Sequence, residues 1–297
     1  MGEFVDVECA MHGTRYLLIG LACSLPVAAA DVGAILDAER QYAQDVIDYG
    51  VRDGFLRHVI EESVVFRPLP TAARTWFEAQ EPADFSLSWQ PRYAEIAASG
   101  DFGYTIGPWT STPLVEGERP VTQGFYTTVW IKGEDGAWHP LVDHGIGGVT
   151  ADESGQPVTV LGETRSAPIE GSYLLNTRYQ GLMAVALRLP LALADAQASI
   201  DRTWLADDLV VLRAGRAPVQ GNDAVRQILS RELGATPPAL TVMAASGDLG
   251  MSLGGEPGRG AYLRLWRHHD ANGWQLAVDV ATPVAAPEPE PETPPAE

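Results

Sequence analysis

The sequence is poor in cysteine, and Cys9 and Cys23 are the two that it contains among 297 residues. Both precede Ala30, in a segment that is expected to be removed on export. The remaining chain would then have no cysteine, which excludes disulfides, a thiolate nucleophile, cysteine-ligated zinc and covalently attached haem. Such an exported protein must be stabilised by its hydrophobic cores alone, and two domains of ordinary size can achieve this.

Basic residues are also scarce, because 20 lysines and arginines stand against 39 aspartates and glutamates and the formal net charge is −19. Proteins that bind nucleic acid or anionic membrane surfaces present basic patches. The acidic surplus therefore argues against both kinds of partner. Its simplest consequence is solubility.

The motifs of several enzyme classes are missing. No G-x-G-x-x-G follows a predicted strand, and there is no Walker loop, G-x-S-x-G or H-E-x-x-H. Nucleotide binding, serine hydrolysis and zincin chemistry thus find no support. The run His268-His269-Asp270 offers at most two metal ligands, since neighbouring strand residues diverge, and is read as a solvated hairpin end. No metal site and no cofactor are predicted.

The N-terminal segment has the layout of a secretory signal peptide. Residues 16–30 carry no charge, follow Arg15 and end in Ala28-Ala29-Ala30 before Asp31. This predicts a signal peptide over residues 1–30 and an exported, periplasmic protein. A spanning helix needs about 20 apolar residues, so no membrane insertion is expected after cleavage.

Two details of this segment leave alternatives. The residues before Met11 are acidic, the wrong sign for a signal peptide, so Met11 is predicted to be the true start. A lipid anchor on Cys23 is the minor alternative to cleavage after Ala30, because no leucine stands three positions before that cysteine.

The chain repeats itself at long range. The segment S-G-D-F-G-Y-T-I-G at 99–107 returns 147 positions later as S-G-D-L-G-M-S-L-G at 246–254, and 124–130 is matched by 260–266. A period this long indicates two copies of a whole domain. We predict a first domain over 31–147, a linker over 148–170, a second, degenerate domain over 171–282 and a disordered Pro/Glu tail over 283–297.

The first copy predicts an α+β fold. Apolar residues at helical spacing run from Ile35 to Tyr49, with Glu39 and Gln41 between them, and a second short helix follows over 51–60. Strand-like runs then cover 64–66, 85–89 passing into 92–98, 102–109, 124–131 and 138–144. Helices followed by an antiparallel sheet make an α+β domain whose sheet curls around the helices.

Four motifs of the first copy resemble a known superfamily. They are L-x-W-x-P at 87–91, S-G-D-x-G-Y-T-x-G at 99–107, G-x-Y-x-T-x-W at 124–130 and D-G-x-W-x-x-x-x-D-x-G at 135–145. Together they look like the nuclear transport factor 2-like superfamily, in a ketosteroid-isomerase and SnoaL-like branch of unknown function. The resemblance covers almost all of 31–147, whereas the second copy has Thr236 in place of the tryptophan of the first motif. It implies two tandem cone-shaped domains, each with N-terminal helices packed in a curved antiparallel sheet around an apolar pocket.

Residues that occur in the first copy alone are the better candidates for function, because residues kept in both copies are expected to hold the fold. The predicted ligand pocket consists of Trp89, Tyr93, Tyr104, Trp109 and His58. Indole and phenol rings provide flat apolar walls with a few hydrogen-bond donors, as small-molecule sites do. The alternative is that the first copy simply has a bulkier core.

Asp143 and His144 are the neighbouring titratable pair predicted for acid–base catalysis, if the protein is an enzyme. Asp143 recurs as Asp279 in the second copy, which favours a structural role. Adjacent strand residues also point to opposite faces, so both can face one pocket only at a bulge.

Three functions therefore stay open. The preferred one is a non-catalytic module that binds a small apolar or aromatic ligand in the first domain. The others are a cofactor-free isomerase or lyase that uses Asp143, and an interaction protein with filled pockets, since the superfamily includes enzymes and non-enzymes. The two copies are expected to pair through their sheets as an intramolecular pseudo-dimer, which would make the chain a monomer.

Overall fold

The computed structural model describes residues 15–16, 31–117, 119–148, 157–162, 166–195, 197–229 and 235–285. The predicted signal segment apart from 15–16, most of the tail and residues 149–156 and 163–165 of the predicted linker lie outside the described residues. In the described part, no helix is both long and apolar enough to cross a membrane.

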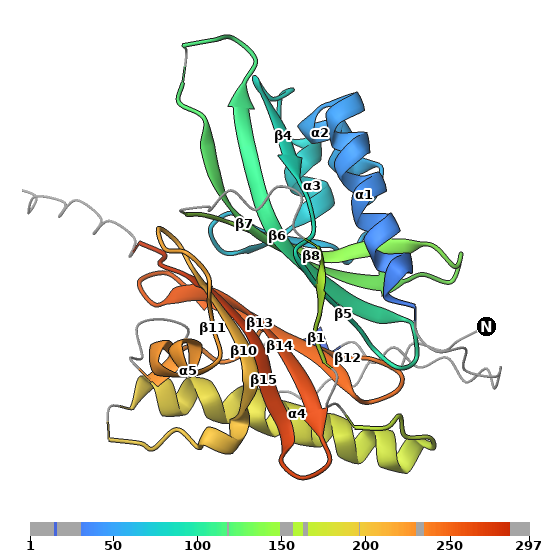
Figure 1. The fold of residues 1–297 in the computed structure, drawn as a ribbon, viewed down its shortest axis with the longest axis vertical. Helices are drawn as coiled ribbons and strands as arrows, with labels where there is room; N and C mark the ends of the chain where they lie inside the picture. The colour runs from blue at the N-terminus through green and yellow to red at the C-terminus, as the bar shows by residue number, and fades with distance from the viewer. Residues whose placement is uncertain are drawn as a thin grey trace, which may run out of the picture.

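In the described residues, the first unit has three helices and an eight-stranded sheet (Figure 1). Its helices are α1 (Val32–Tyr49), α2 (Val51–Leu56) and α3 (Ala73–Glu78). Its strands are β2 (Val64–Phe66), β3 (Pro70–Ala72), β4 (Phe85–Trp89), β5 (Tyr93–Ile96), β6 (Phe102–Pro113), β7 (Thr122–Lys132), β8 (Trp138–Gly147) and β9 (Thr159–Val160). They lie in the order β3-β2-β8-β7-β6-β5-β9, and β4 pairs with the distal part of β6.

The second unit has the helices α4 (Ser172–Ala194) and α5 (Asn222–Leu229) and the 3-10 turn η1 (Arg202–Trp204). Its strands are β10 (Leu205–Arg213), β11 (Val219–Gln220), β12 (Leu240–Met243), β13 (Leu249–Glu256), β14 (Gly260–His269) and β15 (Gly273–Thr282). The short strand β1 (Arg15–Tyr16) pairs with β12 and completes a seven-stranded sheet.

The two sheets have the same strand order. β3-β2-β8-β7-β6-β5 in the first unit corresponds to β11-β10-β15-β14-β13-β12 in the second. Within these runs, the parallel pairs β2 with β8 and β10 with β15 are set among antiparallel neighbours. A further parallel pair extends each sheet, β5 with β9 and β12 with β1. Even the register shift recurs, between Val129 and Trp130 in β7 and between Leu265 and Trp266 in β14. The mixed α+β architecture agrees with the fold class expected from the sequence.

The chain begins its first unit with a well-specified helix. The Asp31 side chain caps α1 by accepting a hydrogen bond from the Gly33 N–H at 2.8 Å. Ile35 and Tyr42 are buried on one face of the helix. Gly50, at a φ of 83°, ends it, because glycine adopts this left-handed region without a steric penalty. Capping and periodicity together therefore place α1 against the sheet.

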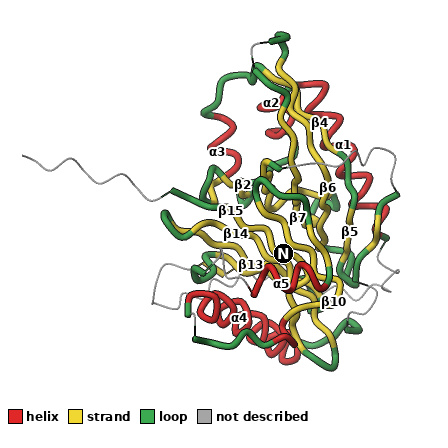
Figure 2. The backbone as a smooth tube through the Cα atoms, turned by 60° about the vertical axis from the view of Figure 1, so that its left-hand side comes forward, coloured by secondary structure: helices red, strands yellow, loops and turns green. Residues whose placement is uncertain are grey.

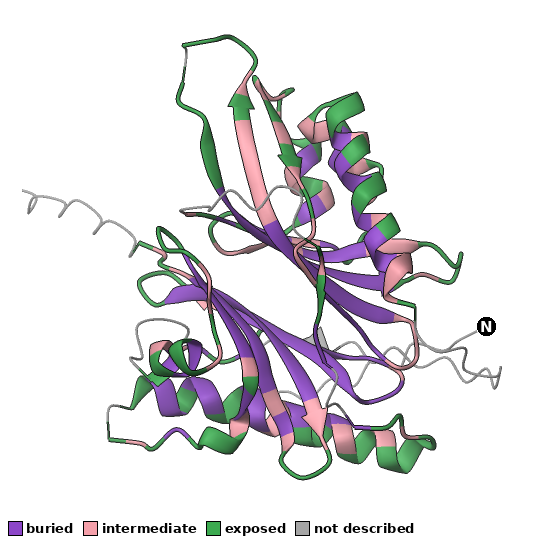
Figure 3. Ribbon diagram, in the orientation of Figure 1, coloured by how far each residue is buried: buried purple, intermediate pink, exposed green. Residues whose placement is uncertain are grey.

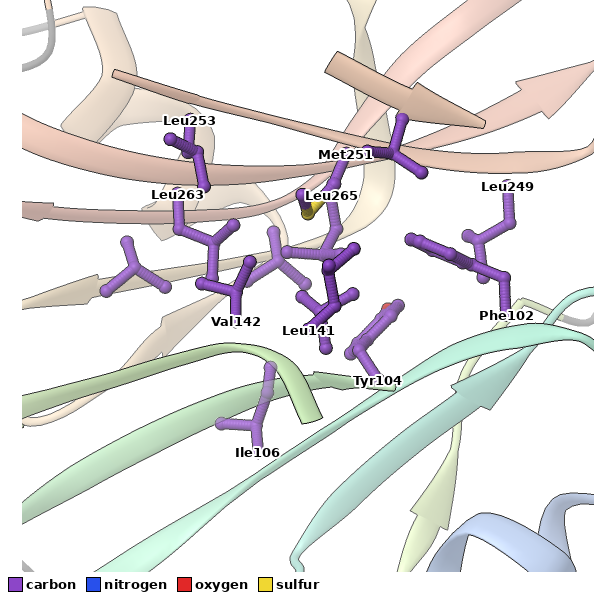
Figure 4. Packing of buried hydrophobic residues seen from close by; sticks show 14 of the residues in the cluster. Phe102, Tyr104, Ile106, Leu141, Val142, Leu249, Met251, Leu253, Leu263 and Leu265 are labelled. Carbon is purple, nitrogen blue, oxygen red and sulfur yellow. The ribbon is translucent and has the colours of Figure 1, made fainter. Parts of the chain in front are cut away.

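The two sheets pack face to face, and the helices cover their outer faces (Figures 1 and 2). The strands that face each other are the most continuously buried part of the molecule (Figure 3). One hydrophobic core joins both units, with Phe102, Tyr104 and Ile106 on one side and Met251 and Leu253 on the other (Figure 4). Each sheet is thus covered on both faces, by helices and by the other sheet.

The repeated Ser-Gly-Asp turns meet at this interface. The Ser99 N–H donates to Ser246 Oγ at 3.1 Å, and the Ser246 N–H donates to Ser99 Oγ at 3.2 Å. The carboxylates of Asp101 and Asp248 each accept a backbone N–H from the opposite unit, at 3.1 Å and 3.0 Å. The contact is reciprocal, as in the isologous interface of a two-fold symmetric dimer.

A buried ion pair also crosses between the units. Arg267 of β14 donates to both carboxylate oxygens of Glu95 in β5, at 2.8 Å and 2.7 Å. The same carboxylate accepts the Tyr104 hydroxyl at 2.7 Å, and Arg267 also reaches Asp208 at 2.7 Å. Because the pair is bidentate and its remaining groups are hydrogen-bonded, it is tolerated inside the core.

Candidate functional site

A cavity of about 370 Å³ opens in the first unit among α2, β4, β6, β7 and β8. Its apolar walls include Phe55, Phe85, Leu87, Trp89 and Trp109. Its polar groups include Arg67, Tyr126 and Asp143. Apolar walls with a few polar groups that converge on them are the usual composition of small-molecule sites.

The two tryptophans are fixed by the pairing of their strands. Trp89 of β4 lies directly opposite Trp109 of β6 in the antiparallel register. The Trp109 indole N–H is shared between two carbonyl oxygens, each at 3.2 Å, and its ring packs closely over Gly124. A Cβ at position 124 would lie 2.7 Å from that ring, so glycine is needed there. The Trp89 indole donates to the Glu39 carboxyl.

Asp143 contributes a carboxyl group to the cavity lining. It is half-buried on β8 and accepts a long hydrogen bond of 3.5 Å from the Thr128 hydroxyl. Burial raises the pKa of Asp143 to about 6, against the opposing effects of the Arg67 charge and of Thr128. Its carboxylate is therefore ionised at neutral pH yet takes up a proton more readily than an ordinary aspartate.

Tyr126 lines the same cavity, and its hydroxyl oxygen is buried. Within the described part of the chain, no hydrogen bond of ordinary geometry reaches this oxygen, although the Thr105 hydroxyl lies close enough to lower its pKa. Burial raises the pKa of Tyr126 well above 10, and the nearby charges of Glu39 and Asp143 raise it further. The phenol therefore stays protonated and is a hydrogen-bond donor. A buried donor without a partner is costly, and such groups in native proteins often mark a ligand or water position.

Glu39 is a buried carboxyl behind the cavity that the sequence pattern assigned to the polar side of its helix. It accepts the Trp130 indole N–H at 3.1 Å and also the Thr105 hydroxyl and the Trp89 indole. Burial raises the pKa of Glu39 to about 7, although these hydrogen bonds lower it. Its distance along the helix from Tyr42, three residues, was the signal that both share the buried face.

Of the predicted site residues, Trp89, Trp109 and Asp143 line the cavity. His144 points the other way, as the alternation of strand residues requires, and stacks on Phe66 with ring centroids 3.8 Å apart. Burial lowers the pKa of His144 to about 3, so it is neutral at physiological pH. Asp143 and His144 therefore do not form one catalytic pair.

Three further predicted residues lie away from the cavity. Tyr104 is fully buried in the core between the sheets, because its β6 position faces the second unit. Tyr93 packs against the same core and lies 5.2 Å below the Arg92 guanidinium. His58 follows α2, binds Asp45 at 2.7 Å and lies with its ring 4.9 Å from that of the buried Tyr42.

The corresponding place in the second unit is filled. Asp279, which matches Asp143, is fully buried and binds the guanidinium groups of Arg264 and Arg213. Arg264 stands where the first unit has Thr128, and its guanidinium lies 4.0 Å from the ring of Tyr262, the match of Tyr126. The two arginines lower the pKa of Asp279 despite its burial. The aspartate that is open to a cavity in one unit is thus neutralised and enclosed in the other.

No family model and no curated protein matches this sequence. Solved structures do resemble part of the chain. One is an NTF-2 like protein of unknown function from Shewanella oneidensis, at 12% identity over 38% of this chain and 96% of that chain, with a TM-score of 0.32. A second is a nuclear transport factor 2-like superfamily protein from Salmonella enterica, at 15% identity over 41% of this chain and 94% of that chain, with a TM-score of 0.31. A third is a ketosteroid isomerase-like protein from Erwinia carotovora, at 12% identity over 39% of this chain and 95% of that chain, with a TM-score of 0.31. Each of these structures matches about two fifths of this chain.

Proposed function

We propose that the first unit binds a small molecule with a flat apolar body and one hydrogen-bond acceptor. The observation that carries this proposal is the contrast between the units: the cavity lies beside Asp143, where Thr128 replaces the arginine that covers Asp279. A volume of about 370 Å³ suits a molecule of two or three fused rings. The indoles of Trp89 and Trp109 would contact its faces, and Tyr126 would donate to its acceptor.

A neutral bicyclic ketone such as 2-tetralone is a suitable probe for this cavity. Its binding should raise the melting temperature, since a ligand at 100 times its dissociation constant adds about 2.7 kcal/mol to stability. Trp109→Leu should abolish the increase. Trp76→Leu is the matched control, because Trp76 is a half-buried indole of α3 that lies outside the cavity. Equal increases in both variants would refute the proposed site.

Proton transfer is the second candidate function, and the position of Asp143 favours it. A carboxylate with a pKa of about 6 is a competent general base near neutral pH. It would take a proton from the carbon next to a ligand carbonyl and return it to another carbon. The Tyr126 hydroxyl would donate to the oxyanion that forms in between. No cofactor takes part in this sequence of steps.

Exchange of hydrogen for deuterium next to the carbonyl of 2-tetralone tests this candidate separately from binding. Asp143→Asn should abolish the catalysed exchange and leave the melting temperature increase in place. Tyr126→Phe should slow exchange by about a hundredfold, the usual cost of one oxyanion donor. Binding without catalysed exchange would contradict the proton-transfer function and support binding as the function of this cavity.

We further propose that the two units are copies of one domain, paired as an intramolecular pseudo-dimer, and that the exported chain is a monomer. The shared strand order and the reciprocal Ser99–Ser246 contact support the pairing. The signal-like segment at 1–30 supports export. A stable homodimer in light scattering, or retention of the processed protein in the cytoplasm, would contradict these proposals.

A further inference from the structure

A second concave site lies on the second unit, outside its sheet core. It is a groove of about 390 Å³ between α4 and the hairpin of β14 and β15. Its lining includes Arg178 and Thr177 from α4, Trp204 from η1, and His268 and Trp274 from the hairpin. The cavity of the first unit shares none of these residues, so the groove is a separate site.

Arg178 gives the groove a cationic group with unused donors. Its Nη1 donates to the Gly247 carbonyl oxygen at 3.1 Å. No carboxylate of the described residues lies within the 4.0 Å of an ion pair with it. A guanidinium has five N–H donors in a planar fork. The half-buried Arg178 can therefore still donate two hydrogen bonds to one anion. Burial lowers the pKa of Arg178, whereas the carboxylates of Asp270 and Asp248 act on it from beyond that distance and raise it.

The aromatic walls of the groove are held rigidly. The Trp274 indole N–H donates to the backbone carbonyl oxygen of Arg178 at 2.8 Å. The ring packs against α4 beside Gly181, where a Cβ would lie 3.4 Å from Trp274 Cδ1, an ordinary van der Waals contact. The Trp204 side chain completes the wall from η1, where the first unit has His58. Flat walls of this kind bind planar rings.

His268 contributes a neutral imidazole. Its Nδ1 lies 2.7 Å from the Oγ of the buried Ser166, and its ring stands perpendicular to Trp274 at 5.3 Å. Burial lowers the pKa of His268 to about 4, and the Arg178 charge lowers it further. With Nδ1 engaged by Ser166, Nε2 is the ring nitrogen left for a ligand, as a hydrogen-bonding group without charge.

We propose that this groove binds an aromatic carboxylate. The carboxylate would pair with the Arg178 fork, the ring would lie against Trp204 and Trp274, and His268 Nε2 would hydrogen-bond a polar substituent. An amide of the same shape would keep the ring contacts and lose the ion pair. The proposal therefore requires discrimination between the charged ligand and its neutral isostere.

Calorimetric titration of the full chain with 2-naphthoate and with 2-naphthamide tests this. Naphthoate should bind with an affinity at least about tenfold above that of naphthamide, and Arg178→Met should remove that advantage. The main-chain oxygen that holds Trp274 is unaffected by this change. Arg188→Met is the matched control, since Arg188 is an exposed residue of the same helix outside the groove. Unchanged melting temperatures would show that both variants fold.

The cavity of the first unit provides the remaining control. Trp109→Leu should leave naphthoate binding intact, whereas Trp204→Leu should weaken it by about tenfold. Naphthoate binding that is lost in Trp109→Leu and kept in Arg178→Met would place the molecule in the first unit and overturn the proposal. Absence of saturable naphthoate binding up to about 1 mM would overturn it as well. Neither result would bear on 2-tetralone, whose binding is measured independently.

Discussion

Replacing Asp143 by asparagine should stabilise the protein at neutral pH, whereas the same change at Asp279 should destabilise it. The two aspartates occupy matching positions of β8 and β15. They differ in what surrounds their carboxylates, since Asp143 faces a cavity and Asp279 is bound by two arginines. The comparison therefore isolates the effect of the surroundings on one residue type in one fold.

The size of the effect follows from the pKa of Asp143, about 6 in the folded protein and 3.8 in the unfolded chain. Because the carboxyl pKa is higher in the folded protein, stability is lost as the pH rises from the pKa of the unfolded chain through the pKa of the folded protein. The loss is between about 1 and 2 kcal/mol at about pH 5 and about 3 kcal/mol at about pH 8. Solvent around the half-buried carboxylate screens its charge, so about 2 kcal/mol is expected at the higher pH.

Asp143→Asn removes this loss, because an amide does not ionise. Its unfolding free energy should exceed that of the unmodified protein by about 2 kcal/mol at about pH 8, and the gap should narrow toward about pH 5. Asp279→Asn should cost about 3 to 5 kcal/mol at neutral pH, since two buried guanidinium groups lose their counter-ion. Urea unfolding followed by tryptophan fluorescence measures both. If Asp143→Asn is as destabilising as Asp279→Asn, Asp143 is a structural residue and the reasoning fails.

Three further changes test other parts of the structure. Thr128→Arg should bring a guanidinium to Asp143, fill the cavity and abolish the 2-tetralone shift without unfolding the protein, and calorimetry that still detects binding would contradict this. Glu39→Gln should reduce the fall in unfolding free energy between about pH 5 and about pH 8, because the pKa of Glu39 is raised to about 7 and its ionisation destabilises the fold as the pH rises. The amide nitrogen cannot accept the indole N–H groups, so about 1 to 3 kcal/mol of unfolding free energy should be lost at low pH. An unchanged pH profile would contradict the assignment. Arg267→Met should cost about 3 to 5 kcal/mol in urea unfolding by leaving Glu95 buried without a counter-ion, and a loss below about 1 kcal/mol would show that the pair is not needed.

The sequence predicts the order of the elements well, because strand and helix periodicities are local signals. It also predicts that Asp143 and His144 diverge, since this follows from strand geometry alone. It does not predict where Tyr104 points. Both faces of β6 are covered, so alternation of polar and apolar residues cannot distinguish the cavity side from the side that meets the second unit.

Glu39 and Arg264 escaped prediction for a different reason. A sequence pattern assigns a charged residue to the solvent-exposed face unless its buried partners are known. Those partners lie on strands that are distant in sequence. Glu39 is matched by Thr105 and Trp130, and Arg264 by Asp279. Long-range hydrogen bonding of this kind is specified by the tertiary fold rather than by neighbours in sequence.

The contrast between Thr128 and Arg264 has a consequence for how such a molecule can evolve. In a homodimer of a single-domain chain, every substitution occurs in both subunits, so a change that fills one cavity fills both. If the two units descend from one domain, as we propose, covalent linkage allows the two copies to change independently. The second copy can then enclose its aspartate with arginines, while the first copy keeps a cavity and a destabilising carboxyl group. The two units can thus differ in their sites while the Ser-Gly-Asp turns continue to hold them together.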